Sequence, residues 1–280
     1  MDAYRRRILF DRFARGACVL ATLLALVPLA SVLVYVTAKG IGGLSWELFT
    51  ALPKPVGELG GGFGNAMLGT LLLVGFACVI SIPIGVLAGL YLSELGGTRL
   101  AQAVRFSADV MSGVPSIAVG IFVYTLVVLS MRSFSAFAGG IALGILMLPT
   151  ITRTTEELLK LVPDSLREAG LALGVPRWRV ILRVVLQTGA PGIATGVMLA
   201  VARAAGETAP LLFTAFGSRF WSVDLDKPIA SLPVQIFTYA VSPYDDWHRQ
   251  AWAAALVLIG MVLLLNVAAR LIAQAQGASR

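Results

Sequence analysis

The chain has 280 residues, of which 58% are hydrophobic and only 13% are charged, and its mean hydropathy is +0.85. Soluble domains carry about 25% charged residues, so this composition excludes a soluble globular protein and indicates a membrane protein. Two cysteines and a single histidine exclude a zinc finger, a His-rich metal site and a disulfide framework.

The distribution of charge and the absence of two motifs narrow the function further. The net charge of +7 is scattered between apolar stretches, with no aromatic-lined groove beside it, so we expect no nucleic-acid binding. The sequence contains no GxxxxGKS/T phosphate loop and no HExxH motif, which excludes a nucleotide-hydrolysing site and a zinc protease. If the protein performs energised work, a partner supplies the energy.

Six uncharged stretches are long enough to cross about 30 Å of hydrocarbon as helices. They lie at residues 17–38, 59–93, 110–131, 133–152, 184–202 and 250–269. The sequence therefore predicts an all-α membrane protein with six transmembrane helices in residues 17–271. Residues 1–16 and 272–280 are expected to form terminal tails.

Two segments leave an alternative to this count. The Arg-rich start and the small residues at 36–38 resemble a secretory signal, but the apolar stretch is too long for one, so we expect a retained helix. The uncharged run 228–244 is short, contains prolines and is flanked by aspartates. We interpret it as an interfacial or re-entrant segment within an outer loop of about 216–249, which leaves six spans.

The basic residues predict the orientation of these spans. Fifteen of the 22 Lys and Arg residues lie on the side of the two termini, six lie on the opposite side, and Arg203 lies beyond the fifth apolar stretch, inside the fifth helix. By the positive-inside rule both termini are cytoplasmic.

The longest hydrophilic segment, residues 153–187, has the pattern of two short helices joined by a turn. Ser165 and Glu168 form a capping-box pattern, Gly174 is a typical left-handed helix end, and Pro176 opens the second helix. The second helix carries Trp178 among several arginines. This pattern fits an amphipathic loop on lipid headgroups or a docking helix for a cytoplasmic partner, and the residues alone leave both open.

Arg203 stands out because it lies twelve residues beyond Pro191, roughly 18 Å along a helix and near the middle of the membrane. A charge buried there costs about 2.5 to 3.5 kcal/mol, so such residues usually face a bundle interior. Glu207 follows at i+4 on the same face. One interpretation is that the two charges only neutralise each other. The other is that Arg203 binds an anion, because its planar guanidinium suits a tetrahedral oxyanion.

Three further features are weaker signals. We expect Asp109, which lies four residues from Arg105, to be a partnered or interfacial acid near the cytoplasmic end. Gly113 and Pro115 predict either a tolerated helix kink or a gating position with exposed backbone groups. The glycine run 60–64 predicts a flexible turn rather than an anion-binding nest.

The hydrophilic segment resembles the EAA loop of the permease subunits of binding-protein-dependent ABC importers. The pattern EAA, three residues, G, nine residues, IxLP is matched by Glu168, Ala169, Gly170, Gly174 and residues 184–187. Gly170, Val184 and Gln187 replace the alanine, isoleucine and proline of the family pattern. The resemblance implies that residues 153–187 are a coupling loop that docks on an ATPase subunit, with Glu168, Ala169, Gly170, Gly174 and Trp178 at the contact.

A more specific resemblance lies in residues 202–214, ARAAGETAPLLFT, which are similar to the PstA permease family of phosphate-specific ABC importers. Residues 60–66, 112–116, 154–157 and 230–234 are similar to the same family. The resemblance implies a type I importer permease in which Arg203, Glu207 and Thr208 lie on the phosphate pathway.

The same resemblance implies the partners and the location. It predicts a heterodimer with a PstC-type permease, a PstB-type ATPase dimer that binds ATP and Mg²⁺, and a periplasmic phosphate-binding protein. The chain itself is expected to bind inorganic phosphate and lipid, to hold no cofactor or metal, and to be no enzyme. Its place is the bacterial inner membrane.

Other classes remain open at this stage. The substrate is alternatively another oxyanion, such as sulfate, molybdate or phosphonate. A self-contained secondary transporter or anion channel also explains a charge pair in the membrane, but it has no reason to keep the spacing from Glu168 to Gly174. A membrane enzyme lacks the required cluster of acids, bases or metal ligands.

Overall fold

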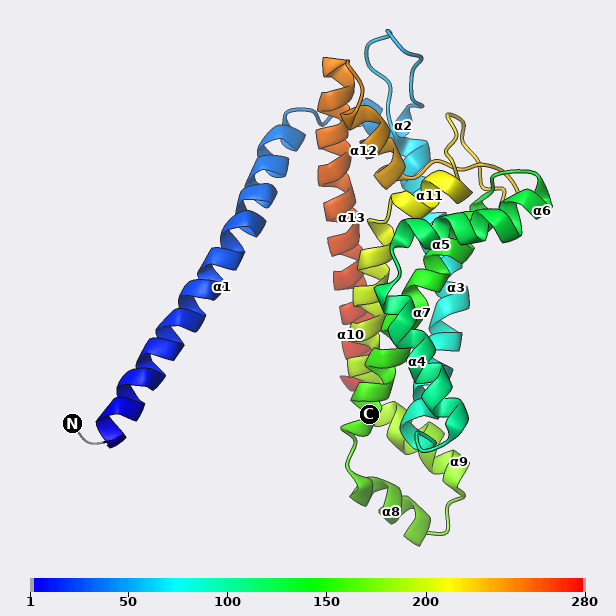
Figure 1. The fold of residues 1–280 in the computed structure, drawn as a ribbon. Coiled ribbons are helices and arrows are strands. Elements are labelled where there is room, and N and C mark those ends of the chain that lie inside the picture. Colours follow the sequence, from blue (N-terminus) through cyan, green and yellow to red (C-terminus); the bar gives the residue numbers. More distant parts are fainter. Residues whose placement is uncertain (1–2, 279–280) are drawn as a thin grey trace.

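The computed structural model describes residues 3–278, and every regular element within them is a helix (Figure 1). The longer helices are α1 (Ala3–Ile41), α3 (Gly64–Glu94), α4 (Arg99–Gly113), α7 (Ala136–Lys160), α10 (Leu186–Ala205) and α13 (Asp245–Ala278). The short helices are α2 (Trp46–Thr50), α5 (Ser116–Val123), α6 (Leu129–Met131), α8 (Asp164–Ala172), α9 (Arg177–Val180), α11 (Ala209–Thr214) and α12 (Leu232–Ala240). Two π-helical stretches, η1 (Tyr124–Val128) and η2 (Ile181–Val185), continue the helices on either side of them.

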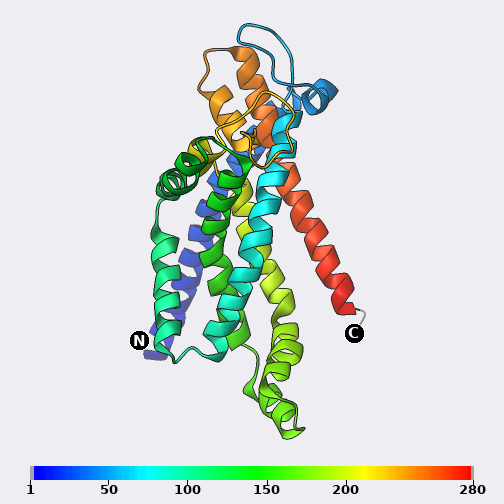
Figure 2. The same cartoon turned by 90° about the vertical axis from the view of Figure 1, so that its right-hand side faces the viewer.

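The centre of the molecule is a bundle of α3, α7, α10 and α13, in which α3 and α7 lie closest together (Figures 1 and 2). Glycines of α3 allow this approach. A Cβ at Gly85 would lie 2.7 Å from Cγ2 of Ile151, and one at Gly89 would lie 2.5 Å from Cβ of Thr155. Small residues let two helix backbones pack closely where no water is present to drive their association.

Within the described residues, five helices are long and apolar enough to cross a membrane. They span Arg6–Ile41, Gly64–Glu94, Ala136–Lys160, Arg177–Ala205 and Asp245–Leu271. The number of spans rises to six if the bent pair of helices Arg99–Gly113 and Ser116–Met131 is counted as one span. The predicted all-α membrane architecture is confirmed, and six spans agree with this upper count.

The third span differs from the prediction. It begins at Arg99 instead of residue 110, and α4 and α5 meet at an angle of 107°. Val114 has extended backbone angles (φ −73°, ψ 130°) because the ring of Pro115 disfavours a helical conformation for the residue before it. Pro115 also lacks the N–H that would continue the helix. The predicted kink is therefore a complete break, and α5 lies across the bundle instead of along it (Figure 1).

α1 stands apart from the bundle and meets it at one end only, next to α13 (Figure 1). The Tyr35 ring packs edge-on against Trp252 with centroids 5.1 Å apart, and a Cβ at Gly40 would lie 2.8 Å from Cβ of Leu256. None of its most apolar window is buried. The helix runs through residue 16 without a break, so the proposed boundary between tail and span stays a prediction.

The hydrophilic segment 153–187 forms a protrusion at one end of the bundle, which we call the α8 end. The predicted capping box is wrong, because α8 begins at Asp164 with Pro163 at the N-cap and no side-chain cap bond. The helix end is confirmed, since Gly174 has φ +75° and the N–H of Val175 donates to the carbonyl of Gly170. The second helix is not separate: α9, η2 and α10 form one continuous span.

The opposite end, which we call the α12 end, holds the loops expected on the outer side. The segment 228–244 contains only the nine-residue α12, packed against α13 and α3, which is too short to cross the membrane. The glycine run forms the predicted turn, and two acidic side chains contact its backbone. Gly60 donates its N–H to Oδ2 of Asp246 at 3.3 Å, and Gly61 donates to Oε1 of Glu47 at 3.2 Å.

Candidate functional site

The fifth span ends in a break that positions the predicted pathway residues. Arg203 occupies the last turn of α10, which ends at Ala205, and α11 begins only at Ala209. Glu207 and Thr208 lie in the short connection, where Thr208 is the N-cap of α11 without a side-chain cap bond. The structure therefore brings all three predicted residues together at the junction of two helices.

The arginine and the glutamate face each other loosely. Nε of Arg203 lies 3.8 Å from Oε1 of Glu207, and their side chains are 66% and 17% exposed. The predicted pairing on one face is confirmed. The expectation that this chain buries Arg203 is wrong, because the neighbouring Ala204 and Ala205 face the bundle and turn Arg203 to the outside. The guanidinium keeps N–H donors available for a further partner.

Two helix breaks meet next to this site. α5 packs across α11, and a Cβ at Gly120 would lie only 2.6 Å from Cα of Pro210. The exposed Gly113 and Pro115 lie at the bend between α4 and α5, one helix removed from Arg203. The bend sets the direction of α5, and α5 in turn supports α11. The gating role of Gly113 and Pro115 stays a prediction.

A second charged cluster, which the sequence analysis missed, joins α4 to α7. Glu156 is fully buried, and its Oε1 accepts bonds from Nη2 of Arg105 at 2.7 Å and from Nζ of Lys160 at 2.6 Å. Nη1 of Arg153 donates to Oε2 of Glu156 at 3.1 Å. We call these four residues the Glu156 cluster. Each carboxylate oxygen has a cationic partner, which offsets the penalty of burying the charge.

An arginine of the cluster is also the partner of Asp109. Oδ1 of Asp109 lies 3.0 Å from Nε of Arg153, and within the described residues Asp109 forms no ion pair with Arg105 at i−4. Asp109 is a partnered acid as predicted, but its partner belongs to another helix. The sequence signal was present in the spacing of Arg153 and Lys160 at i−3 and i+4 of Glu156.

The protruding loop at the α8 end is held in place by Arg167, the residue before Glu168. Its guanidinium donates to the carbonyls of Val162 at 2.6 Å and Leu159 at 3.0 Å, which lie at the end of α7. It also pairs with Oε1 of Glu94 at the end of α3 at 3.1 Å. One side chain therefore ties α8 to the last turns of both central helices.

The predicted contact residues lie on the outside of this anchored loop. Glu168, Ala169 and Gly174 are exposed, and the Trp178 side chain is exposed beneath the guanidinium of Arg179, 5.1 Å away. Gly170 faces inward, and a Cβ there would lie 2.9 Å from Cγ2 of Val180. This contact explains why glycine replaces the second alanine of the EAA pattern.

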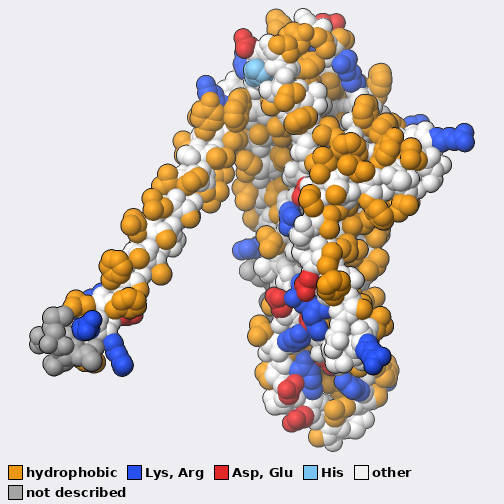
Figure 3. Space-filling model, viewed as in Figure 1, with side chains coloured by type: hydrophobic (Ala, Val, Ile, Leu, Met, Phe, Trp, Pro, Cys, Tyr) orange, Lys and Arg blue, Asp and Glu red, His pale blue; other side chains and the backbone are white. Residues whose placement is uncertain are grey.

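The surface of the α8 end differs from that of the bundle above it. Figure 3 shows Lys, Arg, Asp and Glu side chains gathered at this end, while the middle of the bundle is mostly hydrophobic. Leu173 is 83% exposed between these charges. Leu171 and Trp178 are exposed at the same end, and exposed apolar side chains rimmed by charges mark a protein or membrane interaction site where they form a patch.

Known proteins have sequences similar to that of this chain. The sequence pattern of the binding-protein-dependent transport system inner membrane component family matches residues 81–278. The phosphate transport system permease protein PstA of Yersinia pestis is 49% identical over 272 residues, which cover 97% of this chain and 92% of that protein. PstA 1 of Mycobacterium tuberculosis (strain H37Rv) is 41% identical over 258 residues, 89% of this chain and 82% of that protein.

The chain belongs to the PstA family of binding-protein-dependent permeases. The predicted family is thereby confirmed. As a PstA-family permease it is a multi-pass membrane protein of a transport system that includes a binding protein, and its relatives are transport subunits instead of enzymes.

Solved structures of ABC importers share the fold. The chain matches the MetNI methionine ABC transporter in an inward-facing form with a TM-score of 0.60 and 21% identity, covering 75% of this chain and 92% of that chain. It matches a bacterial ABC transporter for the acidic polysaccharide alginate with a TM-score of 0.63 and 14% identity, covering 95% and 98%. These matches support the type I permease fold of this PstA-family protein.

Proposed function

We propose that this chain is the permease subunit of an ATP-driven, binding-protein-dependent phosphate importer and that it forms half of the translocation pathway. The observation that carries the proposal is the exposed Arg203, paired loosely with Glu207, at a helix break in a chain 49% identical to a phosphate transport permease. The guanidinium fork matches the geometry of a tetrahedral oxyanion, and Glu207 compensates its charge when no anion is bound.

The energy comes from a separate PstB-type ATPase dimer, which binds ATP and Mg²⁺. The support is the protruding loop from α8 to α9, where Glu168 and Leu173 are exposed while Arg167 fixes the helix to α3 and α7. Nucleotide-driven movement of α8 is thereby passed to the two central helices. Glu168, Ala169, Gly170, Gly174 and Trp178 are proposed to form or support this contact.

The pathway is completed by a PstC-type permease. A charge on the outer surface of a membrane-spanning helix is unfavourable in lipid by about 2.5 kcal/mol or more, so the α10 face that carries Arg203 requires a covering partner. α1 is equally uncovered along its apolar window. The pathway between the two permeases then opens alternately to either side of the membrane. The helix breaks at Gly113 and Pro115 and at Thr208 permit this conformational change.

The remaining assignments follow from this arrangement. A periplasmic phosphate-binding protein docks on the α12 end, both termini are cytoplasmic, and the chain resides in the bacterial inner membrane, with lipid around the bundle. This orientation is supported by the excess of basic residues on the side of the membrane where the termini and α8 lie. The fork of Arg203 also accepts sulfate, molybdate or phosphonate, so competition between these anions decides the substrate.

The test is uptake of labelled phosphate into cells that lack this chain, complemented by the wild type, Arg203→Gln or Arg99→Gln. Arg99 is an exposed arginine at the start of α4 and serves as the matched control. We expect ATP-dependent uptake that resists excess sulfate, abolished by Arg203→Gln and retained by Arg99→Gln. Uptake that persists without the chain, or after ATP depletion, contradicts the proposal.

A further inference from the structure

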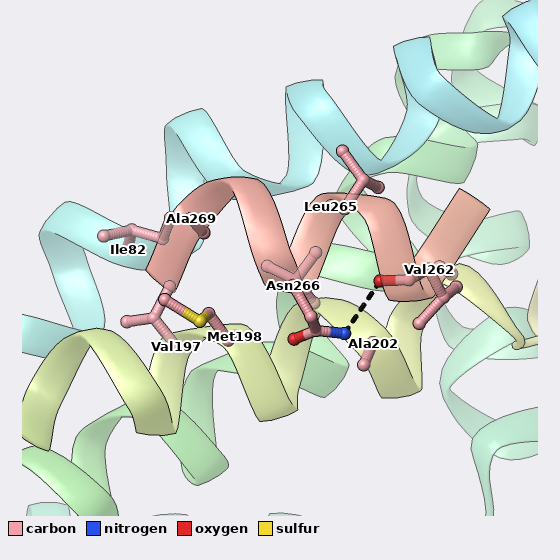
Figure 4. A pocket seen from close by; sticks show the side chains of 10 residues that line it. Ile82, Val197, Met198, Ala202, Val262, Leu265, Asn266 and Ala269 are labelled. Carbon is pink, nitrogen blue, oxygen red and sulfur yellow. Dashed lines mark hydrogen bonds between the residues drawn. The ribbon is translucent and has the colours of Figure 1, made fainter. Parts of the chain in front are cut away.

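A groove with a mostly apolar lining begins at Ala202, next to Arg203 in the sequence, and runs down the face of the bundle toward the α8 end. It has a volume of about 810 Å³ and lies between α7, α10 and α13. Its polar lining consists of Thr154 on α7, Thr195 on α10, and Asn266 and Arg270 on α13. The smaller hollow drawn in Figure 4 adjoins it, since Met198, Ala202 and Asn266 line both.

The groove and Arg203 share one face of α10. Gly192, Gly196 and Leu199 line the groove, and Arg203 follows Leu199 at i+4. Leu199 is as exposed as the arginine, at 66%. Gly192 and Arg203 are eleven positions apart, which corresponds to about 16 Å of helix. The lining therefore leads from the arginine across half the thickness of a membrane.

The charge of this lining suits an anion. Arg270 is its one charged side chain among the described residues, and no carboxylate lines the groove there. Asn266 adds a neutral donor, because its amide nitrogen donates one N–H to the carbonyl of Val262 at 2.8 Å (Figure 4) and keeps a second N–H. Asn266 and Arg270 are four residues apart and lie on the same face of α13.

We propose that the transported anion leaves Arg203 along this groove and that Asn266 and Arg270 receive it on the way to the α8 end. The inference rests on the proposed function, because it takes Arg203 as the site where the anion binds before it enters the groove. The partner permease that covers Arg203 also closes the groove on its open side, which makes an aqueous route between the two subunits. A phospholipid phosphate with its chain in the groove is the rival occupant.

Accessibility of single cysteines tests the route in the complete importer, reconstituted in proteoliposomes after Cys18 and Cys78 are replaced by serine. Leu199→Cys and Val267→Cys place a thiol in the groove, and Leu264→Cys places one on an exposed part of α13 outside it. Each is treated with an anionic sulfonatoethyl or a cationic trimethylammonioethyl methanethiosulfonate. We expect the groove thiols to react several-fold faster with the anionic reagent, Leu264→Cys to react slowly with both, and Arg270→Gln to abolish the preference.

Transport provides the second readout. Arg270→Gln and Asn266→Leu are expected to lower the maximal uptake rate at least tenfold together while the phosphate concentration for half-maximal uptake, set by the binding protein, stays the same. Unchanged uptake in the double variant overturns the proposal, as does equal reactivity of groove and control thiols. An anionic preference that appears only in vesicles with anionic lipid, and vanishes in pure phosphatidylcholine, assigns the groove to lipid and also overturns it.

The two proposals fail separately. If the importer takes up another oxyanion and the thiol pattern persists, the phosphate assignment fails and the route stands. If phosphate uptake requires Arg203 and the thiol pattern is absent, the route fails and the phosphate assignment stands.

Discussion

Two charged groups on neighbouring helices use the same residue types in opposite ways. Glu156 is fully buried, and both of its carboxylate oxygens are bonded to cations of α4 and α7. Arg203 is 66% exposed, and its carboxylate partner Glu207 lies 3.8 Å away. A cluster with every group bonded holds helices together, whereas an arginine with spare donors is available to an anion. Exposure and pairing thus separate a structural charge from the one that we propose to contact the transported anion.

The largest loss of stability is expected for Glu156→Leu. It removes the carboxylate but leaves Arg105, Arg153 and Lys160 around an apolar side chain, which destabilises the fold by about 3 kcal/mol. Thermal unfolding in detergent and the amount of protein in the membrane measure this loss. Glu157→Leu is the matched control, because Glu157 is exposed one residue away. Equal stability of the two variants contradicts the structural role of the cluster.

A smaller loss is expected for Gly170→Ala, although it restores the family's alanine. The new Cβ would lie 2.9 Å from Cγ2 of Val180, which costs about 1 kcal/mol and shifts α8 from its anchored position. ATP hydrolysis by the assembled importer should then be less well coupled to uptake. The double variant with Val180→Ala makes room for the Cβ and should restore coupling. If the single variant behaves as the wild type, the close contact does not set the loop geometry.

Asp109→Asn tests the edge of the Glu156 cluster. The carboxylate is 52% exposed, so losing its pair with Arg153 changes stability by about 0.5 kcal/mol or less. Uptake should stay near the wild-type rate, because Asp109 belongs to the structural group. Uptake that collapses while stability is kept would move Asp109 to the transporting group.

Glu207→Gln should leave the free energy of unfolding unchanged within about 0.5 kcal/mol, because the two charges lie 3.8 Å apart and the arginine is 66% exposed. The substitution removes the counter-charge of Arg203, so the anion is bound for longer and the maximal uptake rate falls. We expect a fall of about threefold, because an ion pair of this kind contributes less than about 1 kcal/mol. Glu157→Gln, on α7, controls for the loss of an exposed carboxylate. Faster uptake in Glu207→Gln would show that the glutamate obstructs the anion.

Local patterns explain which parts of the molecule were predictable. Long apolar stretches predicted five of the spans, and a charge next to one of them identified Arg203 and Glu207, because membranes make such charges rare. Gly174 was predictable because the left-handed helix end needs only the local sequence. These features depend on residues within a few turns of one another.

Features that depend on distant contacts were missed. The Glu156 cluster needs Arg105, which is 51 residues away, and no local pattern specifies that pair. The predicted start of the third span was wrong because α4 contains the charged residues Arg99, Arg105 and Asp109, which interrupt the apolar pattern. Arg105 and Asp109 are tolerated there because they pair with charged residues of α7. Arg203 was expected to be buried because the sequence does not reveal which face of α10 the chain itself leaves open.

The most direct test compares Arg203→Gln with Arg105→Gln, each measured for both phosphate uptake per inserted molecule and thermal stability. The account predicts that Arg203→Gln keeps wild-type stability and loses at least tenfold in uptake, while Arg105→Gln loses stability and membrane abundance and keeps most of its uptake per molecule. If uptake follows stability equally in both variants, the two arginines do the same work and the pathway role of Arg203 is contradicted.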